Sequence, residues 1–215
     1  MKKIVNIILF GICISLCYSQ TIYNGESRFD WDTGWFGDVG NFNATFSLDG
    51  ILAGEYSGSL AVTWPDSVGA THILIPSIEP ADTTGSLYNL FLIYMKDFDG
   101  ILEPQTWNVG AIDAIDFENL DALMMYSEEV DSVLIVGLLN PFLTGELDFN
   151  DIEASLLPMI IDLALDAYVP INGEISLDQV SGYGFSGSFD GSFIMATSIS
   201  FMTISNGSFE HSIPG

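Results

Sequence analysis

The chain has 215 residues, and basic residues are scarce in it: four Lys and Arg stand against 29 Asp and Glu, a net charge of −25. Without Lys2 and Lys3 at the N-terminus the charge is −27, and such a body repels phosphate backbones and anionic lipid surfaces. This balance excludes nucleic acid as a partner and favours cations, but it names no reaction.

The N-terminus has the three parts of a secretory signal peptide. Two lysines are followed by a run at 4–16 that is apolar except for Asn6 and Ser15, and Ser19 offers a small residue for cleavage before Gln20. The apolar run is short for a bilayer span of about 20 residues, so we expect cleavage and a mature chain that does not span the membrane. Residues 1–19 are therefore predicted to be a signal peptide, and the protein to be secreted or periplasmic.

Both cysteines, Cys13 and Cys17, fall within the predicted signal peptide, so the mature chain has no disulfide and no thiolate. Residues 20–215 are ample for one domain, and the chain, 48% hydrophobic, can build a packed core. We predict a single domain that is stabilised by its core alone.

Alternating and apolar runs, separated by turn residues, predict many short strands. Residues 42–49 and 55–64 alternate between apolar and polar side chains, which is the period of a half-buried strand. Further β-rich runs lie at residues 70–75, 87–95, 107–112, 130–138 and 193–205. The run at 87–95 is almost wholly apolar, which predicts a central strand. The pattern favours a mainly β fold, an antiparallel β-sandwich.

Two segments depart from this pattern and predict short helices inserted in the β fold. Apolar residues at helical spacing predict one helix at about 117–126. From 151 to 168 an apolar stripe with a 3.6-residue period lies opposite acidic residues, which predicts an amphipathic helix that covers a sheet face or a sandwich end. The region near 140–168 is thus interpreted as a helical insertion. A membrane-surface helix is disfavoured, because its polar face is acidic.

An internal match is the most specific pattern in the chain. Residues 43–60 align without gaps to residues 172–189, and the identities include the Ser-Leu-Asp and Ser-Gly-Ser triplets of both segments. Both copies have the order strand, Gly-containing turn, strand, which predicts a repeated hairpin, one at each end of the sandwich.

The C-terminal part carries a resemblance. The run GEISLDQVSGYGFSGSFDGSF, which begins at Gly173, and the later run ISFMTISNGSFE resemble the closing hairpins of small exported bacterial β-sandwich domains of unassigned function. Pro104 to Trp107 is similar to the Pro-x-Thr-aromatic strand entry of those domains. The resemblance implies a β-sandwich and export, and it carries no catalytic residue over.

Motifs of the common enzyme classes are missing from the sequence, and no catalytic residue is predicted. His72 lies in an apolar run and is interpreted as structural, while His211 stands close to the C-terminus, and no G-x-S-x-G elbow is present. The sequence also lacks a clustered zinc-ligand set and a phosphate-binding glycine loop. Carboxylates are abundant, which keeps a carboxylate-dependent hydrolase acting on polysaccharide as the alternative function.

Two segments are candidate binding sites. Asp97 and Asp99, with Glu103 nearby, place carboxylates on a glycine-containing turn, which suggests a structural calcium ion as the possible cofactor; a solvated acidic turn is the competing interpretation. Trp31 and Trp35 alternate with Asp residues, as in a surface that stacks on a carbohydrate or cell-surface partner; a first strand that packs inward is the alternative. We expect an exported acidic protein with a non-enzymatic binding or structural role at the cell exterior or in the periplasm.

Overall fold

The computed structural model describes residues 21–34, 37–46, 57–66, 68–83, 85–111, 120–137, 163, 166–195 and 197–214. Ten strands form within these ranges: β1 (Thr21–Asp32), β2 (Val39–Thr45), β3 (Gly58–Pro65), β4 (Thr71–Pro80), β5 (Leu87–Asp97), β6 (Gln105–Gly110), β7 (Ala122–Asp131), β8 (Val169–Ser181), β9 (Gly184–Met195) and β10 (Ser200–Ser212). The predicted signal peptide, residues 1–19, lies outside the described residues.

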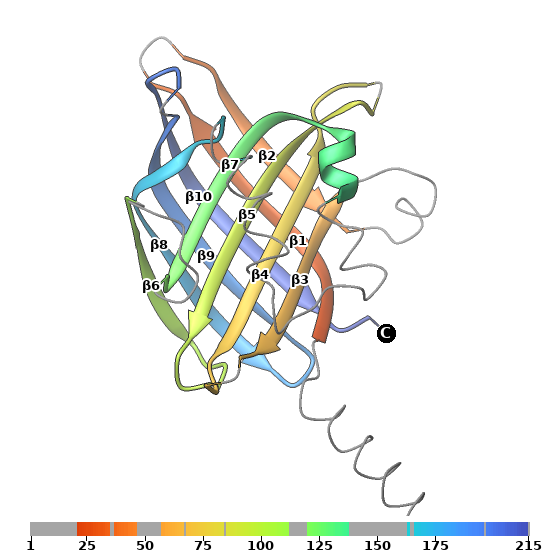
Figure 1. Ribbon diagram of the computed structural model, residues 1–215, viewed down its shortest axis with the longest axis vertical. Coiled ribbons are helices and arrows are strands. Elements are labelled where there is room, and N and C mark those ends of the chain that lie inside the picture. Colours follow the sequence, from red (N-terminus) through yellow and green to blue (C-terminus); the bar gives the residue numbers. More distant parts are fainter. Residues whose placement is uncertain are drawn as a thin grey trace, which may run out of the picture.

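All ten strands belong to one antiparallel sheet, in the order β6-β8-β9-β10-β1-β3-β4-β5-β7, with β2 paired to β1. The sheet curls into a half-barrel, so that β3, β4, β5 and β7 lie in front of β8, β9 and β10 (Figure 1). An isolated bridge between Tyr126 of β7 and Tyr168, just before β8, links the two halves. The mainly β, antiparallel prediction is confirmed. A two-sheet sandwich is not confirmed, because hydrogen bonds connect every described strand into a single sheet.

Strand β1 is long enough to hold two strands along one edge. Residues 21–25 pair with β3, and residues 26–32 pair with β2. In the described residues β2 and β3 therefore pair with β1 and not with each other, while the second copy of the internal match is the β8–β9 hairpin. The prediction of two equivalent hairpins is wrong for the first copy, whose central residues 47–56 lie outside the described part.

The curled sheet encloses one large apolar cluster and carries a second on its outer side. The inner cluster includes Phe29, Phe91 and Phe189, whose rings lie within 6 Å of one another. The outer cluster covers β3, β4, β5 and β7 and includes Leu92 and Leu163. These four strands are thus buried on both faces over most of their length, which explains the long apolar run of β5. The half-buried strand predicted at 55–64 is wrong in this respect, because β3 is buried on both faces from Gly58 to Trp64.

Two predicted elements were wrong in type. The helix predicted at 117–126 is strand β7 over its described part, because Leu123 and Met125 enter the outer cluster while Met124 and Tyr126 enter the inner one. An all-apolar run has no polar side to reveal its period, so strand and helix look alike in sequence. The strand predicted at 130–138 ends at Asp131, whose carboxylate caps a short helix at 132–137 by accepting the Val133 N–H at 2.7 Å.

The second predicted helix, at 151–168, falls mostly outside the described residues. Leu163 is helical and Ala167 is buried, and both contact the outer cluster, as expected of an apolar stripe that covers the sheet. Tyr168 already forms the bridge to β7.

Candidate functional site

The two predicted tryptophans differ in what the structure shows of them. Trp31 lies in β1, half-buried, with its ring against the inner cluster and directly over Gly40 of β2, where a Cβ atom would meet the indole. This is the inward-packing alternative for Trp31. Trp35 lies outside the described residues, so a Trp31–Trp35 surface stays a prediction.

The predicted calcium residues lie at the end of β5, and their carboxylates bond to the protein. Asp97 accepts the Gln105 amide at 2.6 Å and the Asp99 backbone N–H at 3.2 Å, and Asp99 accepts the Ile101 N–H at 3.1 Å. Glu103 is exposed. Burial and the Asp99 carboxyl raise the pKa of Asp97. In the part of the chain that the structure describes, no group of three or more potential metal ligands is found.

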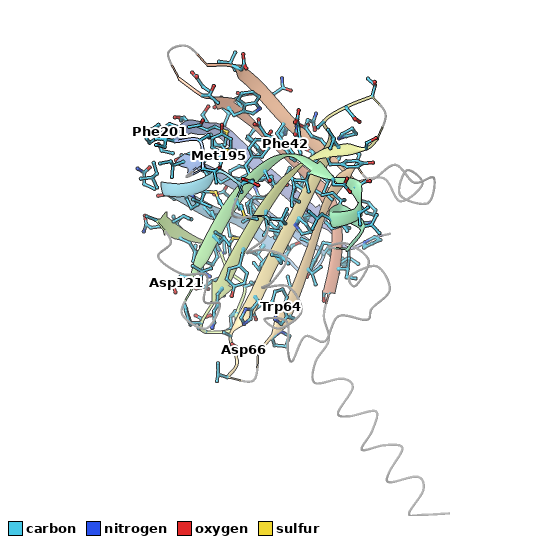
Figure 2. All side chains as sticks on the ribbon, turned by 45° about the horizontal axis from the view of Figure 1, so that its top comes forward. Phe42, Trp64, Asp66, Asp121, Met195 and Phe201 are labelled. Atoms are coloured by element: carbon cyan, nitrogen blue, oxygen red, sulfur yellow. The ribbon has the colours of Figure 1, made fainter. Side chains whose placement is uncertain are left out.

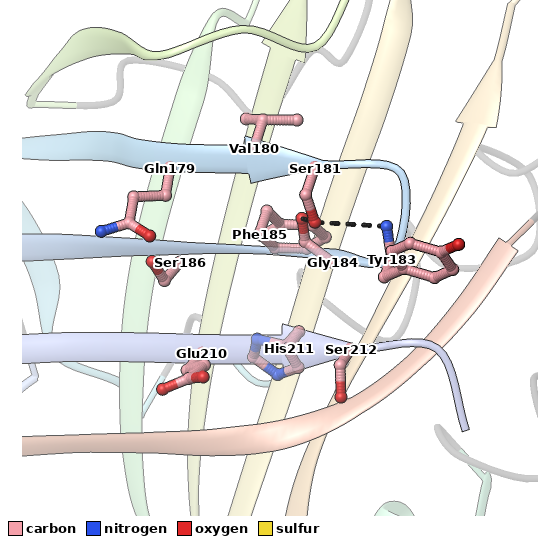
Figure 3. Close-up of a pocket in the computed structure, with 10 residues that line it drawn as sticks. All are labelled: Gln179, Val180, Ser181, Tyr183, Gly184, Phe185, Ser186, Glu210, His211 and Ser212. Atoms are coloured by element: carbon pink, nitrogen blue, oxygen red, sulfur yellow. Dashed lines mark hydrogen bonds between the residues drawn. The ribbon is translucent and has the colours of Figure 1, made fainter. Parts of the chain in front are cut away.

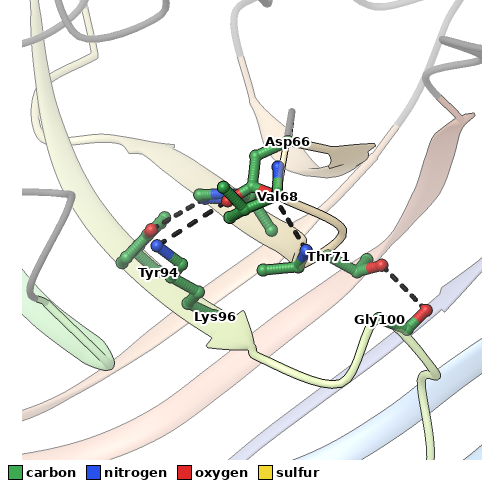
Figure 4. A network of polar contacts seen from close by, with 8 residues as sticks. Asp66, Val68, Thr71, Tyr94, Lys96 and Gly100 are labelled. Atoms are coloured by element: carbon green, nitrogen blue, oxygen red, sulfur yellow. Dashed lines mark hydrogen bonds and ion pairs between the residues drawn. The ribbon is translucent and has the colours of Figure 1, made fainter.

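His72 is buried and belongs to a network with Asp66, Tyr94 and Lys96, which are labelled in Figure 4. Its Nδ1 lies 2.8 Å from the Tyr94 hydroxyl and its Nε2 lies 3.2 Å from the Asp66 carboxylate, which also faces the Lys96 ammonium at 3.8 Å. Burial lowers the pKa of His72, against the opposing effect of Asp66. The imidazole stacks on Trp64 at 5.0 Å. These contacts join β4 to its neighbours β3 and β5 and to Asp66 of the β3–β4 turn, in agreement with the structural interpretation.

His211 lies inside the protein, with 1% of its surface exposed, although it stands four residues from the end of the chain. Its Nε2 lies 2.8 Å from the Ser59 hydroxyl, which in turn bonds Ser77 at 2.7 Å and Ser27 at 2.9 Å. All three serines are fully buried. Gly25 permits this arrangement, because a Cβ atom there would lie 2.6 Å from the imidazole.

The distance between Ser59 and His211 is that of a catalytic serine–histidine pair. The pair lacks access for a substrate and a carboxylate that would orient the imidazole. Ser59 is fully buried, and His211 Nδ1 has no hydrogen-bond partner among the described residues, so no carboxylate orients the ring. Burial lowers the pKa of His211 to about 3, which makes the imidazole neutral. A proton on Nε2, donated to Ser59, leaves only a lone pair unsatisfied on Nδ1. The cluster is therefore a buried polar network of the core.

A surface pocket of about 220 Å³ lies on the outer side of the β8–β9–β10 sheet, beside the β8–β9 turn (Figure 3). Gln179, Ser186 and Glu210 stand opposite one another in neighbouring strands, so their side chains share one face. Tyr183 in the turn, 81% exposed, forms one wall. Ser181 and Ser212 flank Gly184 in the next row, and this glycine lets the backbone of His211 approach closely.

The pocket belongs to a larger exposed face on which the sequence had indicated no site. Next to the pocket, one row of outward-facing residues runs across five neighbouring strands. It consists of four hydroxyl residues and one arginine: Thr106, Ser176, Ser188, Ser208 and Arg28. The sequence did contain one signal for the pocket, since an aromatic residue between two glycines, Gly182-Tyr183-Gly184, places a ring at an exposed turn. The row of hydroxyl residues and the pocket both depend on which strand residues pair with each other, and the sequence does not display this register.

Comparison of the chain with protein-family models, with curated proteins and with solved structures gives no significant match. In the described residues no helix has both the length and the apolar character needed to cross a membrane. The candidate site therefore stands on its own geometry.

Proposed function

We propose that the protein is exported and acts as a non-enzymatic binding protein at the cell exterior or in the periplasm, with a neutral carbohydrate as its ligand. The observation that carries this proposal is the lining of the pocket beside the β8–β9 turn. It combines the exposed ring of Tyr183 with the amide of Gln179, the hydroxyls of Ser181 and Ser186, and the carboxylate of Glu210.

These groups suit a polyhydroxyl ligand. An exposed aromatic ring offers a flat apolar face for the C–H side of a sugar ring, while amide, hydroxyl and carboxylate groups can exchange hydrogen bonds with its hydroxyls. The pocket disfavours an anionic ligand, because its described lining contains the carboxylate of Glu210 and no lysine or arginine to offset it. A small volume open to solvent fits one end or one unit of a chain better than a buried metabolite.

The same lining favours binding over hydrolysis. A glycosidase needs two carboxyl groups about 5–10 Å apart on either side of the scissile bond. Glu210 is the one carboxylate among the described residues that line the pocket. His211 also borders the pocket, but its surface is 1% exposed and its partner Ser59 is fully buried, so the pair offers no accessible nucleophile. Export itself is supported by the N-terminal charge and hydropathy pattern, and it predicts a mature protein that begins at Gln20.

The test is NMR titration of the mature chain with soluble neutral oligosaccharides. We expect chemical-shift changes confined to residues 179–186 and 210–212 for at least one glycan. Tyr183→Ala should weaken binding about tenfold or more, whereas Tyr183→Phe keeps the ring and should retain most of the affinity. Phe201→Ala, which removes an exposed aromatic ring at the other end of β9 and β10, is the matched control.

Two results would count against the proposal. Shift changes that avoid the pocket, or an affinity that is equal in Tyr183→Ala and the native chain, would remove carbohydrate binding at this place. Release of reducing ends from a polysaccharide, abolished by Glu210→Gln, would instead favour the hydrolase alternative.

A further inference from the structure

The outer face of β8, β9 and β10 changes character at the end opposite to the pocket. There the outward side chains are apolar and several are exposed: Phe201 by 55%, Ile199 by 73% and Ile171 by 37%. Together with the half-buried Val169 and Ile194 they form what we call the upper apolar patch. Figure 2 shows Phe201 at this end of the molecule, far from Trp64 and Asp66.

The register of the strands makes this patch continuous. Val169 pairs with Ile194, and Ile194 pairs with Phe201, so three apolar side chains stand in one row across three strands. A bulge between Pro170 and Asn172 adds Ile171 beside this row. One row further along each strand, Asn172, Ser192 and Thr203 are polar again. The apolar character is thus local, which distinguishes it from the scattered apolar residues of an ordinary surface.

The turn at the tip of the patch is strained. Ile199 has a φ of 52°, a left-handed conformation that a β-branched residue rarely adopts, and its side chain is nevertheless exposed. A glycine or asparagine would relieve this strain, and a polar residue would suit the exposure. Strain of this kind tends to occur where a side chain has a role beyond folding.

Carboxylates border the patch. Asp32 pairs with Thr203 at its edge, and in the next row Glu174 and Asp190 stand directly opposite each other, with Asp30 further across on β1. Like charges opposed in this way destabilise a sheet unless a cation lies nearby. The two described basic residues lie elsewhere, Arg28 beside Glu26 at 3.6 Å and Lys96 in the buried Asp66 network.

We propose that the upper apolar patch is a docking surface for a protein partner that presents an apolar side chain surrounded by lysine or arginine residues. An apolar centre with a polar, charged rim is the usual anatomy of a protein interface. Here the neutral row of Asn172, Ser192 and Thr203 is followed by carboxylates, and the charges described around the patch are all negative, so charge complementarity selects a basic partner and speeds its association. The proposal is independent of carbohydrate binding, because the patch and the pocket lie at opposite ends of β9.

Two other occupants fit less well. A second copy of this chain would bring together two acidic rims on bodies of charge −25 each. A bilayer with anionic lipids would be repelled by the same carboxylates. Both are included as outcomes of the test.

The experiment measures binding of a labelled synthetic peptide of alternating Leu and Lys to the mature chain by fluorescence anisotropy, at low and at physiological salt. Peptides of alternating Ser and Lys and of alternating Leu and Glu are the controls for charge alone and apolar contact alone. Phe201→Ser removes the centre of the patch without changing net charge. Val68→Ser, at an 83% exposed valine in the β3–β4 turn, is the matched control variant.

We expect the Leu–Lys peptide to bind more tightly than either control peptide and to weaken as salt is added. Phe201→Ser should lose about tenfold in affinity, while Val68→Ser should leave it unchanged. Equal losses in the two variants, or none in Phe201→Ser, would overturn the proposal, since binding would then be charge attraction alone. A native dimer that Phe201→Ser dissociates in sedimentation, or binding to neutral phosphatidylcholine vesicles that it abolishes, would also overturn it, because the occupant would be a second copy or a bilayer.

Discussion

The buried imidazole of His211 makes the free energy of unfolding depend on pH in a way that one substitution removes. Burial lowers its pKa from the ordinary 6.5 to about 3 in the folded protein. In the unfolded chain the imidazole binds a proton below about pH 6.5, whereas in the folded protein it stays neutral. The unfolded state therefore gains a proton first as the pH falls. The stability contributed by His211 is present above pH 6.5 and is lost between 6.5 and about 3.

The size of the effect follows from the width of this window. One group that is protonated only in the unfolded state costs about 1.4 kcal/mol of unfolding free energy per pH unit. Between pH 6.5 and 4.5 the loss from His211 alone reaches about 2.5 kcal/mol, a large share of the roughly 5–15 kcal/mol of an ordinary domain.

The assay compares urea unfolding of the native chain and of His211→Gln, followed by tryptophan fluorescence at several pH values from 7 to 4.5. Glutamine can still donate a hydrogen bond toward Ser59 but does not titrate. His72 and Glu79, whose pKa values are lowered and raised by burial, are present in both chains, so their contributions cancel in the difference. The variant should lose less stability on acidification, by about 1.4 kcal/mol per pH unit below 6.5.

Parallel pH profiles for the two chains would refute the reasoning. Should His211→Gln fail to fold, NMR titration of the imidazole in the native protein decides the matter directly. We expect its ring signals to stay constant down to about pH 4.5, and a midpoint near the ordinary value of 6.5 would show that the ring is not buried as the structure has it.

Further predictions concern the serine network, a close contact and calcium. Ser59→Ala leaves its three bonded partners with fewer acceptors and donors and should cost about 2–3 kcal/mol in urea unfolding, against less than about 0.5 kcal/mol for the exposed Ser188→Ala. Gly25→Ala would place a Cβ atom against the imidazole of His211 and should lower stability by about 1–3 kcal/mol, so an unchanged urea midpoint would contradict the close approach. If calcium binds at the β5–β6 turn, millimolar calcium should raise the melting temperature of the native chain and not of Asp99→Asn; unchanged melting in both would remove that site.

Much of the β architecture could be predicted from local pattern. Alternating residues around Phe42 identified β2, and the apolar run at 87–95 identified a strand with neighbours on both sides. The pattern around Leu60 predicted a strand where β3 lies, although β3 is buried on both faces and not on one. The pattern failed where apolar residues follow one another without a break. At 122–126 both helix and strand would bury every side chain, and only the packing against both clusters distinguishes them.

The candidate site was less accessible to prediction, for a different reason. His211 looked unimportant because of its position near the C-terminus, yet pairing of β10 with β1 brings it beside Ser59, 152 residues earlier in the chain. The pocket likewise joins Gln179 and Glu210 through the register of three strands. Contacts between residues so far apart are set by strand pairing, and no local periodicity encodes them.

The sequence by itself determined the acidic charge, the confinement of both cysteines to the first 17 residues and the alternation that predicts strands. These properties depend on residue type and on neighbours within a few positions. The tertiary structure alone decided that the described strands join in one curled sheet, that β2 and β3 share an edge of β1, and which polar residues lie inside. The physical reason is that a backbone group bonded to one strand is unavailable to another, so β2 can pair only with the residues of β1 that β3 leaves free, and this competition is settled only when the strands pair.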